Sequence, residues 1–237
     1  MSQCAKPQSP VGNRIFAALS GEEYKRILPG LEQISLSQGE AVYECGERQS
    51  YAYFPTTSIV SLIYTMEDGA TAELAMVGNE GLVGIASFMG GESRPNQAIV
   101  QHAGGAIRMK VKTLREEFKH CGSFQFVLLR YTQALITQIS QIAVCNGLHT
   151  VEQRLTRRLL LTRDRVSSDE LQVTQESLSN ALGVRREAVT FAVGCLRHKA
   201  LIICSRGHIQ ILNGASLEAA ACECYRVVKD EYDRLLG

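Results

Sequence analysis

The segment Val173–Gly194 constrains the fold most, because its pattern predicts two short helices separated by a glycine. Thr174 can cap the first helix, and Leu178 and Leu182 give that helix one apolar face. Gly183 then allows the chain to leave the helix in a left-handed conformation. This layout predicts a helix-turn-helix.

The second helix is expected to begin near Arg185 and to bury Ala188, Val189 and Ala192. Its outer face is then polar, and in a helix-turn-helix the start of this helix contacts base edges in the major groove of DNA. Two packed helices with solvated charges are the alternative explanation of this segment taken alone. The expected DNA contacts of the two helices are Thr174, Gln175, Arg185, Arg186, Glu187 and Thr190.

Two short apolar stretches follow the second helix, Leu201–Cys204 and Ile209–Leu212, with a glycine-containing turn between them. They predict a β-hairpin, and a hairpin in this place makes the module a winged helix. Arg206 and His208 near its tip are expected to contact the phosphate backbone, a contact that does not depend on base sequence. A polar hairpin turn without such a role is the alternative.

Positive charge is concentrated in the same part of the chain. The whole chain carries a net charge of +1, whereas residues 150–215 carry +4 and the segments before and after them carry −1 and −2. Neutralisation of DNA phosphates requires such an excess of Lys and Arg. The distribution therefore supports DNA binding by this segment.

The chain has 237 residues, a length that suits two modest domains. No apolar run approaches the ~18–20 residues of a membrane span, and the first residues lack the apolar core of a signal peptide. We therefore expect a cytoplasmic protein with no membrane partner, in which the eight cysteines stay reduced. Cys222 and Cys224 are expected on different faces of a short helix. Incidental thiols are the preferred interpretation, so no metal site is predicted, and a metal or redox site is the alternative.

The region from Leu31 to about Met109 is predicted to be almost entirely β. Asp68–Gly69 and Gly104–Gly105 each indicate a hairpin turn between two strands. Short strands at regular spacing predict a β-roll of the jelly-roll type. The expected strands are Leu31–Leu36, Ser58–Thr65, Thr71–Val77, Ala98–Ala103 and Ala106–Val111.

A long helix is predicted from about Ser123 to Asn146, and its apolar residues form two stripes. One stripe can pack on the β-roll, and the other is available for a coiled coil with a second copy. Burial of both stripes within one chain is the alternative. The second stripe consists of Leu129, Ile136, Ile139 and Ala143. The first stripe, to which we assign the dimer interface, consists of Leu128, Leu135 and Ile142.

The expected fold class is α+β, with a β-roll in residues 13–121, a dimerisation helix and hinge in residues 122–147, and a winged helix-turn-helix in residues 148–237. The last of these includes an added C-terminal helix, which we expect to pack against the winged helix. A homodimer is expected because a helix-turn-helix usually reads two half-sites related by a two-fold axis.

From about Leu31 to Leu212 the chain resembles the bacterial transcription regulators of the cyclic-AMP receptor and fumarate-nitrate reduction regulator family, the Crp/Fnr family. The most specific residues for this resemblance are Thr174–Ser179, Leu182–Gly183 and Arg186–Val189.

This resemblance implies that Arg186 and Glu187 read guanine and cytosine edges, and the donors and acceptors of those bases fit the two side chains. Phe191 stands where the family often has a third base-reading Arg, and Arg185 stands where it usually has Ser. We therefore expect DNA binding, but not to the family's usual operator sequence.

The resemblance also implies an effector pocket in the β-roll, but its phosphate-binding cassette departs from the family pattern. Ile85 or Ala86 stands in place of the cassette Glu, and the position of the phosphate-binding Arg falls near Asn96. We predict that the protein does not bind cyclic AMP and has no cofactor; a different small-molecule effector is the alternative. The expected pocket residues are Gly84, Ile85, Arg94, Asn96 and Gln97.

No enzyme is predicted, because the sequence has no nucleophile elbow, zinc-protease helix, P-loop or dinucleotide-binding motif in the required context. The sequence predicts a regulator that binds double-stranded DNA as a homodimer on a pseudo-palindromic operator. The resemblance adds RNA polymerase and a small-molecule effector as partners. A sensor or scaffold whose winged helix binds protein is the alternative.

Overall fold

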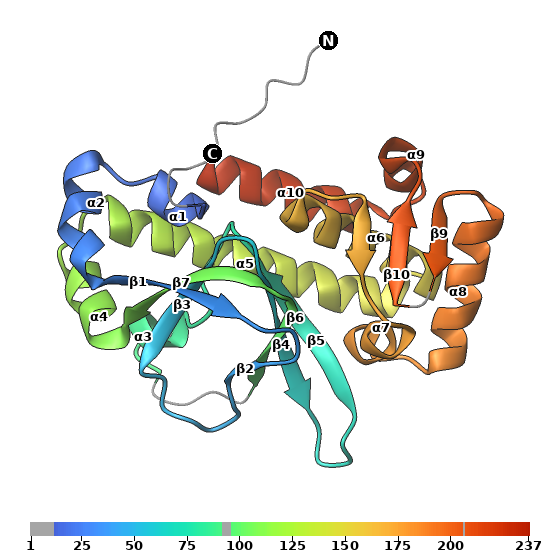
Figure 1. Cartoon of the computed structure of the whole chain (residues 1–237), viewed down its shortest axis with the longest axis horizontal. Helices are drawn as coiled ribbons and strands as arrows, with labels where there is room; N and C mark the ends of the chain where they lie inside the picture. Colours follow the sequence, from blue (N-terminus) through green and yellow to red (C-terminus); the bar gives the residue numbers. More distant parts are fainter. Residues whose placement is uncertain (1–11, 92–95, 206) are drawn as a thin grey trace, which may run out of the picture.

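The computed structural model describes residues 12–91, 96–205 and 207–237. A β-roll, one long helix and a winged helix-turn-helix follow one another along the chain (Figure 1). The α+β class and this architecture agree with the prediction. Arg94 and Arg206, two of the expected site residues, lie outside the described residues.

Two antiparallel sheets form the β-roll, one with the strand order β1-β7-β3 and the other with the order β2-β6-β4-β5. Phe54, Val60, Val100 and Met109 are buried in its core. The first sheet consists of β1 (Leu31–Leu36), β7 (Gly104–Lys110) and β3 (Tyr51–Pro55). The second consists of β2 (Ala41–Tyr43), β6 (Gln97–His102), β4 (Ile59–Thr65) and β5 (Thr71–Val77).

Gly104 and Gly105 do not form the hairpin turn that the sequence indicated. Both belong to β7, and β6 and β7 lie in different sheets. A side chain at Gly104 would come within 2.7 Å of the backbone nitrogen of Ser58, so glycine is needed here for the close approach of two chain segments. The other predicted hairpin is correct, because β4 and β5 pair up to Thr65 and Thr71 on either side of Asp68.

Short helices precede, interrupt and follow the strands of the β-roll along the chain. The Asn13 side chain caps the first of them and donates to the carbonyl oxygens of Pro55 and Gly81 at 2.8 and 2.9 Å. These helices are α1 (Arg14–Ala17), α2 (Gly21–Ile27), the 3-10 turn η1 (Leu28–Gly30), α3 (Ala86–Met89) and α4 (Val111–Lys119).

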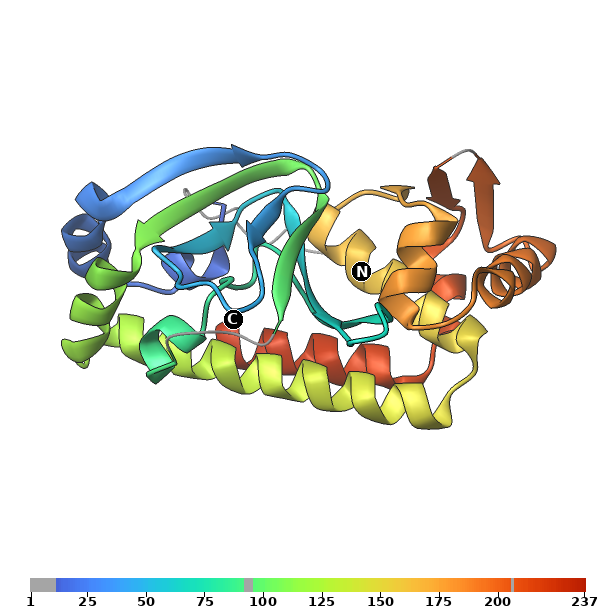
Figure 2. The same cartoon turned by 90° about the horizontal axis from the view of Figure 1, so that it is seen from below.

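The long helix α5 (Ser123–Leu148) runs along the molecule, and α10 (Glu223–Leu236) lies beside it in the opposite direction (Figure 2). Tyr131 of α5 contacts both the β-roll and α10. Its hydroxyl donates to the Leu82 carbonyl oxygen at 2.8 Å, and its ring centroid lies 6.4 Å from that of Tyr232 on α10. The expectation that the C-terminal helix packs against the winged helix is corrected, because its main partner is α5, followed by α6.

The winged module is a helical core with a three-stranded sheet of order β8-β10-β9. Leu159, Leu178, Val189 and Leu196 are buried in it. None of the helices in the described part of the chain is both long and apolar enough to cross a membrane. The module contains α6 (Val151–Val166), β8 (Glu170–Gln172), α7 (Gln175–Leu182), α8 (Arg186–His198), β9 (Ile202–Ser205), β10 (His208–Ile211) and α9 (Gly214–Ala219).

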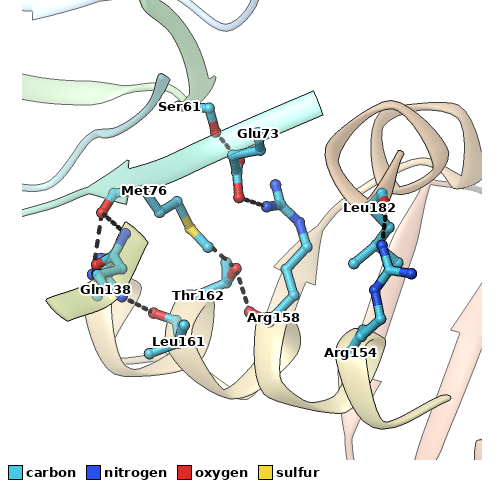
Figure 3. A network of polar contacts seen from close by, with 10 residues as sticks. Ser61, Glu73, Met76, Gln138, Arg154, Arg158, Leu161, Thr162 and Leu182 are labelled. Carbon is cyan, nitrogen blue, oxygen red and sulfur yellow. Dashed lines mark hydrogen bonds and ion pairs between the residues drawn. The ribbon is translucent and has the colours of Figure 1, made fainter. Parts of the chain in front are cut away.

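A buried polar network joins α6 to the β-roll (Figure 3). Arg158 donates to the Glu73 carboxylate on β5, and the same carboxylate accepts a hydrogen bond from Ser61 on β4. Two turns further along α6, Arg165 forms a salt bridge of 2.7 Å with Glu80. A buried charge is stable only when it is paired, so these contacts hold the winged module in one position against the β-roll.

Candidate nucleic-acid interface

The first helix of the helix-turn-helix begins and ends at the expected residues. The Thr174 hydroxyl accepts from the Ser177 backbone nitrogen at 3.0 Å, and the Ser177 hydroxyl accepts from the Thr174 nitrogen at 3.1 Å. Gly183 ends α7 in the left-handed region, with φ of 61°. Arg154 of α6, whose pKa is lowered by burial, donates to the Leu182 carbonyl oxygen. These contacts fix the direction in which α8 leaves the turn.

The first turn of α8 presents its polar side chains to solvent. Arg185 is the extended N-cap residue, and Arg185, Arg186 and Glu187 are all exposed, while Val189 faces the core. Within the described ranges, no residue forms a side-chain hydrogen bond or ion pair with the side chains of these three. Their charged groups are therefore available to an external partner.

Gln175 and Thr190 connect the two helices at the edge of this surface. The Thr190 hydroxyl lies 3.0 Å from Oε1 of Gln175 and 3.0 Å from the backbone oxygen of Arg186. Phe191, which is 76% exposed, extends the same surface beyond Thr190. The structure thus brings together every candidate DNA contact of the two helices.

The wing is a three-stranded sheet, because β8 pairs with β10 on the side opposite β9. His208 is exposed at the start of β10, opposite Ser205 on one side and Gln172 on the other. Gly207 provides the left-handed backbone of the turn, with φ of 74°. Strand β8 was not predicted, because the alternation of apolar and polar residues cannot be detected in a strand of three residues.

Much of the positive charge of residues 150–215 lies away from this surface. Arg154, Arg157, Arg158 and Arg165 of α6 are between 4 and 8% exposed. Two of them pair with glutamates of the β-roll. The net charge of the segment therefore overstates the charge available to DNA.

The cassette region of the β-roll contains one polar residue that the sequence analysis missed. Gly84 is buried with φ of +126°, and a side chain there would come within 2.7 Å of the amide oxygen of Gln49. Both polar atoms of the Gln49 amide are buried, and no described residue forms a hydrogen bond with them. Buried amides normally have partners, so Gln49 is a candidate ligand contact. Ile85 follows as the residue before α3 and offers no polar side-chain atom.

Gln97 is the first residue of β6 and Asn96 precedes it, and both already have partners within the protein. Asn96 donates to the Tyr43 hydroxyl at 3.0 Å, and Gln97 donates to the Thr65 hydroxyl at 3.2 Å. Neither side chain carries a charge. The expected pocket residues that the structure describes therefore supply no cation for a phosphate.

Two family models match successive parts of the chain. Residues 33–121 match the cyclic nucleotide-binding domain, and residues 153–220 match the Crp-like helix-turn-helix domain. The chain belongs to the Crp/Fnr family of transcription regulators. The two matches correspond to the β-roll and the winged module, on either side of α5.

Solved structures share this Crp/Fnr fold at low sequence identity. FixK2 from Bradyrhizobium japonicum is 18% identical, with a TM-score of 0.69 over 81% of this chain and 98% of FixK2. A CRP-family transcriptional regulator from Thermus thermophilus is 19% identical, with a TM-score of 0.66 over 79% of this chain and 96% of that one. CLP from Xanthomonas campestris, a c-di-GMP responsive global regulator, is 17% identical, with a TM-score of 0.62 over 82% and 100%. No curated protein matches the chain at the level of sequence.

Two of the three residues in the predicted dimer stripe of this Crp/Fnr protein are buried within their own chain. Leu128 and Leu135 are 0 and 1% exposed, and Ile142 is half-buried. The assignment of Leu128 and Leu135 to the dimer interface is therefore wrong, because they belong to the core of their own chain. The physical reason is that the β-roll and α10 together cover this side of α5.

A different side of α5 is exposed and apolar. Leu129 and Ile136 are 47 and 50% exposed, and they belong to the stripe that was expected to pack on the β-roll. Residues that alternate three and four positions apart form the seam of a coiled coil. The exposed seam consists of Phe126, Leu129, Gln133, Ile136, Ser140 and Ala143.

Proposed function

We propose that this protein is a cytoplasmic transcription regulator, not an enzyme, that binds double-stranded DNA as a homodimer on a pseudo-palindromic operator. The observation that carries the proposal is the exposed and unpaired Arg186–Glu187 pair at the start of α8. An Arg guanidinium can donate two hydrogen bonds to O6 and N7 of guanine, and a Glu carboxylate can accept one from N4 of cytosine. We therefore assign the reading of G and C edges to these two residues.

The remaining contacts are proposed to position the module on the duplex. Arg185 and Thr190 lie beside the base-reading pair, and Phe191 can contact a thymine methyl group. Arg206 and His208 of the wing are assigned to phosphates, as are Thr174 and Gln175 at the start of α7.

The dimer is proposed to form along the exposed seam of α5. Two copies meeting there through a two-fold axis would present their recognition helices to two half-sites about one helical turn, ~10–10.5 bp, or a multiple of it apart. The proposed organisation keeps the β-roll in residues 13–121, the dimerisation helix and hinge in residues 122–147 and the DNA-binding part in residues 148–237. RNA polymerase is the further macromolecular partner that we expect.

We further propose that the β-roll does not respond to cyclic AMP. A buried cyclic phosphate needs a cation, for which Arg is suited by its two-pronged geometry, and the ribose hydroxyl needs an acceptor. Asn96 is neutral and its side chain already donates a hydrogen bond to the Tyr43 hydroxyl, and the Ile85 side chain has no acceptor. The unpaired amide of Gln49 favours a second possibility, in which a different polar ligand binds near Gly84.

The central experiment is selection of bound sequences from a random DNA pool by the full-length protein, followed by titration of the selected site at graded salt. We expect enrichment of two inverted half-sites and an affinity that falls linearly with salt on logarithmic axes. If no sequence is enriched and binding does not respond to salt, the winged module is instead a protein-binding scaffold.

A further inference from the structure

Four potential metal ligands converge where α5, α6 and α10 meet. Cys145 lies in the last turn of α5, His149 follows that helix as its C-cap, and Cys222 and Cys224 lie at the start of α10. Their Sγ and imidazole nitrogen atoms all lie within 4.8 Å of one another. The three cysteines are buried and His149 is half-buried. None of the four residues belongs to the recognition helix or to the cassette region.

Cys222 and Cys224 do not lie on different faces of one helix, so the expectation from the sequence is wrong. Cys222 is the N-cap of α10 and has an extended backbone, with φ of −74° and ψ of 161°. Only Cys224 is inside the helix, so the rule that residues two apart on a helix diverge does not apply to this pair. Both thiols therefore reach the same point beside Cys145.

Two distances within the cluster are close to those between the ligands of one tetrahedral ion. Sγ of Cys145 lies 3.6 Å from Sγ of Cys222, and Sγ of Cys224 lies 3.5 Å from Nδ1 of His149. With Zn–S bonds of about 2.3 Å and Zn–N bonds of about 2.0–2.1 Å, a tetrahedron has S–S edges of about 3.8 Å and S–N edges of about 3.5 Å. A disulfide would instead require an S–S distance of about 2.05 Å.

The surroundings of His149 are those of a metal ligand. Its Nδ1 faces the cysteines, and its Nε2 lies 3.5 Å from Oε2 of Glu223. A carboxylate on the far nitrogen holds the proton there and leaves the other nitrogen free to bind a metal, as in carboxylate–histidine–zinc arrangements.

The charge near the cluster also suits a metal-bound group of thiolates. Three thiolates and a neutral imidazole around a divalent ion carry a net charge of −1. Arg157 is 4% exposed, lies within electrostatic reach of Cys145 and Cys224, and has no hydrogen-bond partner for Nε or Nη1 among the described residues. A buried guanidinium without a partner is costly, and an anionic centre beside it would supply the missing counter-charge.

We propose that Cys145, His149, Cys222 and Cys224 form a closed structural zinc site. Sulfur-rich tetrahedral donor sets select zinc or iron–sulfur clusters, and four donors gathered this tightly around one point favour a single ion. All four positions are filled by protein, so the site has no open position for catalysis. Zinc would fasten α10 to the junction between α5 and α6, which is where the chain passes from the dimerisation helix into the DNA-binding module.

The proposal is tested by measuring zinc in the full-length protein, purified under reducing conditions without chelators and dialysed against metal-free buffer. We expect one zinc per chain in the wild type and in Cys45→Ser, whose thiol is exposed and does not belong to the cluster, and loss of stoichiometric zinc in Cys224→Ser. Because Cys224→Ser can fail to fold, Glu223→Gln at the exposed carboxylate provides a second variant. It should keep the fold and weaken zinc affinity by about 10–100-fold.

Cobalt provides a readout that needs no variant. The reduced wild-type protein loaded with Co²⁺ should show the intense visible bands of a tetrahedral site and thiolate-to-cobalt charge transfer. A full-length protein that holds no zinc and takes up none when reduced and supplied with zinc sulfate would overturn the proposal. So would a Cys145–Cys222 disulfide in peptides from the protein as isolated, or bound iron and sulfide in place of zinc.

Discussion

Arg165 of α6 and Glu80 of the β-roll form a salt bridge of 2.7 Å in which each side chain is only 6% exposed. The same guanidinium donates to the Met76 carbonyl oxygen at 3.2 Å and to Oε1 of Gln138 on α5 at 3.1 Å. One side chain of the DNA-binding module thus contacts both the β-roll and the central helix. A substitution of Arg165 would therefore remove contacts of the DNA-binding module with both the β-roll and α5.

Removal of Glu80 should destabilise the protein strongly, because it leaves a buried guanidinium without its counter-charge. We expect Glu80→Ala to lower the free energy of unfolding by about 3–5 kcal/mol, measured by urea denaturation. Glu116→Ala, which removes an exposed glutamate of α4, serves as the control and should change it by less than about 0.5 kcal/mol. Equal stability of the two variants would show that the buried pair contributes nothing.

Substitution of the base-reading arginine should weaken and broaden DNA binding. Arg186→Ala should cost about 1–3 kcal/mol on the selected operator and relax the choice of base at one position of each half-site. Gel shifts with the operator and its single-base variants measure both effects. Arg226→Ala removes the same charge from an exposed position on α10 and should leave binding unchanged. If both variants bind alike, Arg186 does not read a base.

The wing arginine should behave differently from Arg186. Arg206→Ala should weaken binding to all sequences alike and reduce the salt dependence by about one unit of logarithmic slope, as expected for a lost phosphate contact. The measurement is the affinity for operator and random DNA at several salt concentrations. A selective loss on the operator alone would mean that the wing reads sequence.

Two neighbouring residues on α5 should separate dimerisation from folding. Ile136→Asp places a charge on the exposed seam, so it should give a folded monomer, whereas Leu135→Asp buries an unpaired carboxylate and should unfold the chain. Light scattering gives the molar mass, and circular dichroism gives the fold. A dimeric Ile136→Asp protein would exclude this seam as the interface.

Cyclic AMP should not bind the β-roll, because Asn96 brings no charge to the position of the phosphate-binding Arg and Ile85 has no acceptor in place of the cassette Glu. Calorimetric titration of the full-length protein should show no heat of binding at micromolar ligand. Micromolar binding that disappears in Arg94→Ala would contradict this and identify Arg94 as the phosphate anchor. Binding that survives in Arg94→Ala but is lost in Gln49→Ala would place the ligand at Gly84 instead.

The parts of the fold that could be predicted are those in which neighbouring residues determine the structure. The helix-turn-helix follows from a cap at Thr174, a glycine at position 183 and helical spacing between them, and all of these act within a few residues. The Asp68 hairpin is local in the same way. The prediction of a turn at Gly104–Gly105 was wrong, because two glycines are also needed where two chain segments approach closely. The segment that approaches here contains Ser58, which is far away in the sequence.

The choice between the two stripes of α5 could not be made from the sequence, since both are apolar and both have the required spacing. The choice depends on α10, which begins at residue 223, 75 residues after α5 ends at residue 148. The cysteine cluster was missed for the same reason. Cys145 and Cys222 are 77 residues apart, and their meeting depends on how α10 lies on α5.

The antiparallel arrangement of α10 on α5 has a consequence for synthesis of the chain. The Arg14 side chain at the start of α1 donates to Asp233 and to the Gly237 carbonyl oxygen, so the first and last helices hold each other in place. On the ribosome, the buried side of α5 therefore stays partly uncovered until residues 223–236 have emerged. During that interval a growing chain would carry an exposed apolar strip on α5. The risk of aggregation is then at its highest.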